Sequence, residues 1–179
     1  MGRNHMRERA MNFQKMMVIA AMGCLFLGVS GGAAMAEGCG DGVIQGERFE
    51  GTLRVTDERS CTIIGSTIRG DLRIINVDNV LLMNNTVNGL IRVDGREADE
   101  SVANVVENTV FGGKLVVRDY EIANVIGNET LNKDEGDIRV ITNIRAFVQQ
   151  NLAARDLICR GNTAVDASYN VAKGKERCD

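Results

Sequence analysis

The amino-acid sequence predicts an all-β fold, a right-handed single-stranded parallel β-helix (β-solenoid) of about six coils whose ends are capped by disulfides. Three observations indicate this fold: a short phrase that recurs at a nearly fixed period, alternation of apolar and polar residues within the phrase, and cysteines gathered near both ends of the repeat region. Self-similarity at a fixed period is typical of solenoids, in which each repeat contacts only its neighbours.

The N-terminus has the order of a secretory signal peptide. Basic residues precede an apolar run from Met16 to Val29, and the small-residue site Ala34-Met35-Ala36 follows. We therefore expect residues 1–36 to be removed before Glu37, with Met11 as an alternative start. The apolar run has about 14 residues, whereas a bilayer span needs roughly 20, so we expect no transmembrane anchor. The predicted location is periplasmic or extracellular.

The charge of the remaining chain argues against nucleic acid as a partner. Residues 37–179 carry 17 basic and 23 acidic side chains, a net charge of −6. Binding to nucleic acid depends on neutralising phosphates, which an acidic chain does poorly. The segment is long enough for one domain. We assign residues 37–50 to an N-terminal cap and residues 51–179 to a parallel β-helix with its C-terminal cap.

Four cysteines follow the signal segment: Cys39, Cys61, Cys159 and Cys178. An even number in an exported chain predicts two disulfides, for which three pairings exist. Because the cysteines gather at the two ends of the repeat region, Cys39–Cys61 and Cys159–Cys178 are the favoured pairs. No Cys-x-x-Cys spacing indicates a zinc or redox site.

The recurring phrase has the two-residue period of a β-strand, as in Leu72, Arg73 and Ile74. Its aliphatic residues are largely β-branched, and glycine or asparagine stands where we expect the chain to turn. The varying spacing favours the right-handed form over left-handed helices built on strict hexapeptides. Copies separated by 19, 19, 24, 23 and 19 residues begin at Gly51, Gly70, Gly89, Gly113, Gly136 and Arg155.

One apolar position of each phrase is expected to point inward and stack on its counterpart in the next coil. Coils stack about 4.8 Å apart, and each buried aliphatic side chain stabilises the fold by about 2 kcal/mol. The absence of proline leaves every backbone N–H available for the ladders between coils. The inward row consists of Leu53, Leu72, Ile91, Leu115, Ile138 and Leu157.

A second row holds asparagines near one corner of successive coils. Stacked side-chain amides can bond each other and the turning backbone, so we interpret the row as structural rather than as a metal or glycan site. The sequence indicates that the register drifts by one residue after Asn128. The row consists of Asn85, Asn108, Asn128, Asn151 and Asn170.

From about residue 51 to 178 the chain resembles secreted bacterial β-helix proteins of the pectate-lyase-like group. The closing stretch Asp156–Asn162, followed by Asn170–Gly174 and Cys178, is similar to the terminal coil of bacterial members. The resemblance implies export and a right-handed parallel β-helix. Many β-helices of this architecture cleave polysaccharides, but fold alone does not carry activity.

Acidic residues follow the first strand of several coils and form the weaker of two candidate sites. Stacked carboxylates could hold Ca²⁺ through hard oxygen ligands. No calcium-loop spacing is present, however, and turns favour such residues anyway, so a solvated corner is the main interpretation. No other cofactor is expected. The residues concerned are Asp57, Asp78, Asp99 and Asp119.

Arginines form the stronger candidate, because alternation places them outward on one sheet. On adjacent coils they should lie about 5 Å apart, where like charges repel unless acids or an anionic ligand intervene. Two interpretations remain: a self-neutralised face, or a site for an acidic polysaccharide or another cell-envelope component. The predicted row is Arg54, Arg73, Arg92 and Arg139, and the acids expected on the same face are Asp71, Asp94, Asp137 and Asp156.

The residue content argues against catalysis. The single histidine, His5, lies in the signal segment, and the chain has no tryptophan. No nucleophile elbow, phosphate loop or metal-ligand pair is visible. A non-catalytic binding or structural module is therefore favoured. The alternatives are a small polysaccharide lyase or hydrolase and a self-associating or adhesive β-solenoid; the oligomeric state stays open.

Overall fold

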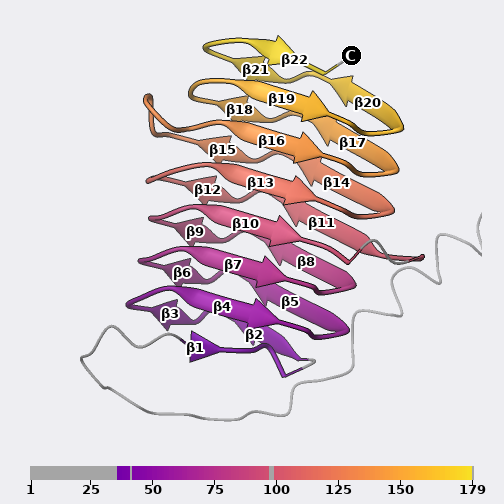
Figure 1. The fold of residues 1–179 in the computed structure, drawn as a ribbon. Coiled ribbons are helices and arrows are strands. Elements are labelled where there is room, and N and C mark those ends of the chain that lie inside the picture. The colour runs from indigo at the N-terminus through magenta and orange to yellow at the C-terminus, as the bar shows by residue number, and fades with distance from the viewer. Residues whose placement is uncertain (1–35, 41, 97–98, 179) are drawn as a thin grey trace, which may run out of the picture. The chain divides into compact units, whose positions relative to one another are not determined.

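A computed structural model describes residues 36–40, 42–96 and 99–178, so the predicted signal segment lies outside the described residues except for Ala36. The described chain winds into a parallel β-solenoid of about seven turns (Figure 1). Strands of successive turns lie side by side and form three parallel sheets, which we call A, B and C. Among the described residues, no helix is long and apolar enough to cross a membrane.

Sheet A contains eight strands. Its strands are β1 (Ala36–Glu37), β4 (Leu53–Thr56), β7 (Leu72–Ile75), β10 (Ile91–Asp94), β13 (Leu115–Arg118), β16 (Ile138–Ile141), β19 (Leu157–Arg160) and β22 (Glu176–Arg177). Sheet B contains seven strands. Its strands are β2 (Val43–Gln45), β5 (Ser60–Ile64), β8 (Asn79–Met83), β11 (Val102–Val106), β14 (Ile122–Ile126), β17 (Arg145–Gln149) and β20 (Ala164–Ser168).

Sheet C also contains seven strands, each of two residues. Its strands are β3 (Arg48–Phe49), β6 (Thr67–Ile68), β9 (Thr86–Val87), β12 (Thr109–Val110), β15 (Glu129–Thr130), β18 (Leu152–Ala153) and β21 (Val171–Ala172). These strands are short because the chain turns sharply before and after them. Asn84 and Gln150, which precede two of the strands, have φ angles of 56° in the left-handed region.

The inward row confirms the predicted fold. All six members are fully buried, and each pairs in register with its counterpart one turn away. In β4 the burial alternates, because Leu53 and Val55 face the core while Arg54 faces solvent. Apolar area removed from water in this way is the main stabilising contribution to folding.

The solenoid has about seven turns rather than the predicted six, because the segment assigned to an N-terminal cap already forms strands. Residues 36–49 contribute β1, β2 and β3, which pair with β4, β5 and β6 of the next turn. The predicted cleavage site, between Ala36 and Glu37, lies within β1. Cleavage there keeps Glu37 as the first residue of the first turn.

The glycine that opens most phrases is required by close approach and not by a left-handed backbone. Neither Gly70 nor Gly89 has a positive φ angle. A Cβ atom at Gly70 would lie 2.7 Å from the carbonyl carbon of Gly51, and one at Gly89 would lie 2.7 Å from the carbonyl oxygen of Gly70. Successive turns therefore approach too closely at Gly70 and Gly89 for a side chain, although the equivalent position in the sixth phrase is Arg155. Close approach thus explains two glycines that we had assigned to turning.

The asparagine row forms a continuous hydrogen-bond ladder, as predicted. The backbone N–H of Asn85 donates to Oδ1 of Asn108, whose own N–H donates to Oδ1 of Asn128, both at 3.0 Å. The same pattern continues through Asn151 to Asn170. The predicted drift in register is wrong, because Asn128 and Asn151 align fully and Glu129 simply replaces the threonine that follows the asparagine in earlier turns.

Both predicted disulfides are present, near the two ends of the stack. Cys39 pairs with Cys61, with their Cα atoms 5.5 Å apart, and Cys159 pairs with Cys178 at 4.5 Å. All four cysteines pack against the core or belong to it. Each disulfide therefore ties the outermost turn to the turn beneath it.

Candidate functional site

The strongest candidate site is the part of the outward side of sheet A that carries the four predicted arginines together with Arg118, which we had not predicted. We call this surface the arginine face. Because neighbouring strands of a parallel sheet lie about 4.8 Å apart, residues in register form regular columns along the stack. The arginine face is defined by Arg54, Arg73, Arg92, Arg118 and Arg139.

The first three arginines form an uninterrupted column. Arg54 of β4 pairs in register with Arg73 of β7, which pairs with Arg92 of β10. In the next turn the column is occupied by Val116, and Arg139 follows one turn later. Arg139 therefore belongs to the same column as the other three but is separated from them by an apolar position.

Carboxylates hold most of these guanidinium groups in place. Nη2 of Arg73 lies 2.8 Å from Oδ2 of Asp71, and Nε of Arg92 lies 2.6 Å from Oδ2 of Asp94. The side chains of Arg73 and Arg92 nevertheless remain 44% and 43% exposed. Each arginine thus keeps N–H donors facing solvent, so it is oriented by its acid without being withdrawn from the surface.

Asp94 also binds the arginine that sequence reasoning missed. Nε of Arg118 lies 2.7 Å from Oδ1 of Asp94, so this one carboxylate bridges Arg92 and Arg118 on adjacent strands. The hydrogen bond to Asp94 raises the pKa of Arg118 further, against the opposing effect of partial burial. The signal was available in the sequence, because Arg118 stands two residues after the outward position Val116 in the alternating strand β13.

A second carboxylate, Asp137, is fully buried between two arginines. Arg139 and Arg155 donate to it at 2.7 Å and 2.5 Å. Burial alone, the largest single influence, would raise the pKa of Asp137, but the hydrogen bonds from Arg155 and Arg139 outweigh it and lower the pKa below its ordinary value. Asp137 therefore stays ionised and fixes the C-terminal part of the arginine face.

Arg54 of the predicted arginine row and Asp156 of the predicted acids differ in their roles. Arg54 is exposed, and no hydrogen bond or ion pair joins its guanidinium group to another residue in the part of the chain that the structure describes. Asp156 accepts the backbone N–H of Lys175 at 2.8 Å and lies 4.0 Å from Arg155, so it mainly supports the turn to the last strand. The acids on this face thus form ion pairs with some arginines and not with others. The N-terminal arginine, Arg54, is the least neutralised.

The predicted acidic corner does not gather its carboxylates. Asp57 and Asp78 lie 3.5 Å and 3.9 Å from Arg96, and Asp119 accepts a hydrogen bond from Thr142. Asp99 lies in an exposed turn. These four aspartates do not belong to any group of three or more ligand atoms within 4.8 Å among the described residues. Calcium binding stays a prediction for which the corner offers no assembled set of ligands.

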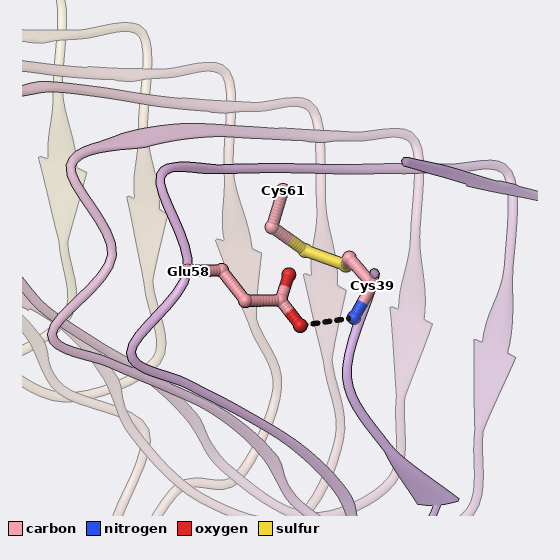
Figure 2. Close-up of side chains that lie close together, drawn as sticks. All are labelled: Cys39, Glu58 and Cys61. Carbon is pink, nitrogen blue, oxygen red and sulfur yellow. Dashed lines mark hydrogen bonds between the residues drawn. A yellow bond between two sulfur atoms is a disulfide. The ribbon is translucent and has the colours of Figure 1, made fainter. Parts of the chain in front are cut away.

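One such group does occur, at the N-terminal disulfide: Cys39, Glu58 and Cys61. Figure 2 shows the carboxylate of Glu58 beside the disulfide, with Oε1 accepting the N–H of Cys39 at 2.9 Å. The N–H of Gly40 donates to the same oxygen at 3.1 Å. Zinc binds cysteine as a thiolate. Since both sulfur atoms are joined in the disulfide, the group ties the first turn to the second and does not form a metal site in this state.

No family model, no curated protein and no solved structure matches this chain. The arginine face is therefore the feature from which a function can be inferred.

Proposed function

We propose that this chain is an exported, non-catalytic binding module whose arginine face holds an extended polyanion, such as an acidic polysaccharide of the cell envelope. Its membership of the pectate-lyase-like β-helix group and its periplasmic or extracellular location belong to the same proposal. The observation that supports it most is the column of Arg54, Arg73 and Arg92 in register.

The distribution of charge favours an anionic ligand. The strands of sheet A contain seven arginines and three acidic residues, whereas sheet B has one of each and sheet C has one of each. The strands of sheet A are therefore net +4 in a segment, residues 37–179, whose net charge is −6. A chain that is acidic overall concentrates its arginines on one of three sheets, which a solvated surface does not require.

The spacing favours a polymer over a small anion. Arginines about 4.8 Å apart along a straight column offer N–H donors at regular intervals to charges strung along a chain. Guanidinium groups bind carboxylates and sulfates through paired hydrogen bonds, and the acids beneath Arg73 and Arg92 orient those groups before a ligand arrives. Because the contacts are exposed, binding should be weak and should weaken further with added salt.

The test uses fluorescently labelled polygalacturonate and dextran sulfate as probes and neutral dextran as the reference. We expect the two anionic probes to bind at low salt and neutral dextran not to bind. The triple substitution Arg54→Gln, Arg73→Gln and Arg92→Gln should weaken binding about tenfold or more, equivalent to at least 1.4 kcal/mol. Its melting temperature should stay close to that of the unmodified chain, because the Arg73 pair is half-exposed and the buried Asp94 keeps its hydrogen bonds from Arg118.

A matched control removes three exposed cations from other surfaces: Arg69→Gln, Lys133→Gln and Arg145→Gln. It has the same change in net charge, so it should bind both anionic probes like the unmodified chain. Equal weakening by both triple variants would show a response to net charge alone and would overturn the proposal. The same conclusion follows if neither anionic probe binds, or if the arginine variant binds normally.

A further inference from the structure

The carboxylate beside the N-terminal disulfide has one satisfied oxygen and one unsatisfied oxygen. Oε1 of Glu58 accepts the backbone N–H groups of Cys39 and Gly40 at 2.9 Å and 3.1 Å. Oε2 of Glu58 is buried and has no hydrogen-bond partner among the described residues. Burying a carboxylate oxygen without a partner is costly, so a cation or donor that binds there recovers that cost.

A second buried oxygen provides a comparison. Among the described residues, Oδ1 of Asp78 is the one other buried side-chain nitrogen or oxygen that lacks a hydrogen bond. It lies 3.9 Å from Nε of Arg96, so a guanidinium group compensates part of its charge. Glu58 forms no such ion pair with an arginine or lysine in the described part of the chain. Of these two acids, Glu58 is therefore the one without a protein cation.

The two sulfur atoms of the disulfide lie next to this carboxylate. Sγ of Cys39, Sγ of Cys61 and a carboxylate oxygen of Glu58 all lie within 4.8 Å of one another, and Figure 2 shows the three side chains together. Cys61 is fully buried and Cys39 is partly buried against the core. Cysteine thiolates and carboxylates are both ligands of Zn²⁺, which can bind three protein ligands and a water molecule as a tetrahedron.

The C-terminal disulfide has different surroundings. Cys159 and Cys178 are followed and preceded in the chain by the basic residues Arg160 and Arg177. No carboxylate or imidazole forms a group of three ligand atoms with this disulfide among the described residues. The chain thus contains two cysteine pairs of similar separation, 22 and 19 residues, and one of them has a carboxylate beside it. The two pairs therefore differ in the ligands that they can offer to a metal ion.

We propose that Cys39, Glu58 and Cys61 bind Zn²⁺ when a thiol reductant opens the N-terminal disulfide. The reductant supplies two electrons and two protons, so the S–S bond breaks, two thiols form and the reductant becomes a disulfide. Zn²⁺ then displaces the two thiol protons, which pass to solvent, and is held by two thiolates and Oε2 of Glu58. The ion joins the first turn to the second in place of the disulfide. None of its ligands belongs to the arginine face, so the site is independent of polyanion binding.

The test uses Co²⁺ as a spectroscopic probe for the Zn²⁺ site. Protein purified from the exported fraction is reduced with dithiothreitol in the absence of oxygen, freed of reductant by gel filtration and titrated with Co²⁺. A single Co²⁺ ion per chain should give sulfur-to-cobalt charge-transfer absorption and the visible bands of tetrahedral Co²⁺. Added Zn²⁺ should abolish these bands by displacing Co²⁺. The oxidised protein should show none of them, because its sulfur atoms are joined in disulfides.

Substitutions identify the ligands in the same reduced state. Cys39→Ser should abolish the charge-transfer band, whereas Cys178→Ser should keep it. Glu58→Gln keeps an oxygen for the two backbone N–H groups but replaces the anionic oxygen by an amide, so Co²⁺ affinity should fall about tenfold or more. The matched control Glu107→Gln makes the same change of charge at an exposed position in a later turn and should bind Co²⁺ like the unmodified chain.

A second measurement follows the fold itself. Zn²⁺ should raise the melting temperature of the reduced unmodified chain and leave that of reduced Cys39→Ser unchanged, because the ion binds the folded chain through both turns. The proposal is overturned if the reduced chain gives no sulfur-to-cobalt absorption, or if Cys178→Ser removes that absorption while Cys39→Ser keeps it. Equal Co²⁺ affinity of Glu58→Gln and Glu107→Gln also overturns it, because the carboxylate is then not a ligand.

Discussion

Sheets A and B are alike on the side that faces the core and different on the side that faces solvent. Inward, both carry fully buried aliphatic residues in register, such as Leu115 in sheet A and Leu82 in sheet B. Outward, sheet A carries its arginines, whereas the half-buried outer side of sheet B is mostly apolar. These sheet B residues are Ile64, Leu81, Met83, Val102, Val106, Ile122, Ile126 and Phe147.

The difference shows which positions the fold constrains. A parallel solenoid needs inward aliphatic side chains, close-packed corners and paired backbone groups, and both sheets meet these needs in the same way. The outward positions are not required for folding, so two sheets of one solenoid can differ fully there. Outward residues are therefore where binding properties of this chain are expected, and inward residues are where its stability is expected.

The largest effect is expected from truncating the core, equally in the two sheets. Leu115→Ala and Leu82→Ala each remove a fully buried side chain, and each should lower the free energy of unfolding by about 3 kcal/mol. Urea unfolding followed by circular dichroism measures both. A cost of less than about 1 kcal/mol for one of them would show that the inner sides of the two sheets are not equivalent.

A somewhat smaller effect is expected at the corner that sheets B and C share. Asn108→Ala removes the acceptor of the Asn85 N–H and the donor to the Leu82 carbonyl, both buried. Unsatisfied buried polar groups cost at least about 1 kcal/mol each, so we expect the two together to lower the free energy of unfolding by about 2 kcal/mol. The exposed Asn88→Ala serves as the control in the same turn and should change stability by less than about 0.5 kcal/mol.

An intermediate, pH-dependent effect is expected from the buried acid of sheet A. The pKa of Asp137 is lowered in the folded state, so its ionised form stabilises the fold above the unfolded pKa of about 4, and this contribution disappears as pH falls through the folded pKa. Asp137→Asn should therefore cost about 1–2 kcal/mol at pH 7 and progressively less at acidic pH. Urea titrations at several pH values test this sign.

The control for that substitution is Asp71→Asn, which affects a half-exposed pair with Arg73. It should cost less than about 1 kcal/mol at pH 7. If Asp137→Asn costs as little, or if its cost grows as the pH falls, then the buried pairing of Asp137 does not stabilise sheet A.

The smallest effect is expected on the outer side of sheet B. Ile126→Thr shortens a half-buried outward side chain while keeping β-branching, so stability should change by less than about 0.5 kcal/mol. Binding of labelled polygalacturonate should be unchanged, in contrast to the triple arginine variant. Loss of polyanion binding in Ile126→Thr would break the assignment of binding to sheet A.

The parts of the structure that repeat could be predicted from the sequence, and the parts that depend on single contacts could not. The inward row, the asparagine row and both disulfides follow from period and spacing. The extra turn was missed because Val43–Phe49 lacks the recurring phrase, although its strands pair normally. Arg118 was not predicted because it lies at the second outward position of its strand, outside the column that contains Arg54, Arg73 and Arg92.

Other contacts do not recur from turn to turn, so the repeat pattern does not predict them. Tyr120 is buried, and its hydroxyl donates to the carbonyl of Val77, 43 residues away. Burial, reinforced by nearby aspartates, raises its pKa well above the ordinary value. A second asparagine pair, Asn143 and Asn162, repeats the ladder pattern at another corner over two turns only. A tyrosine or a single pair gives no periodic signal, so only the folded chain reveals these partners.

Because the turns stack in register, the length of the arginine face is set by the number of turns. Each turn receives its core contacts, backbone bonds and ladder partners from the turn before and the turn after. Insertion of a single residue in a strand would turn the following side chains of that strand to the wrong side, whereas gain or loss of a complete 19-residue unit such as residues 70–88 preserves every column. Selection acting on such a chain can therefore change the reach and avidity of the surface in discrete steps without inventing new contacts.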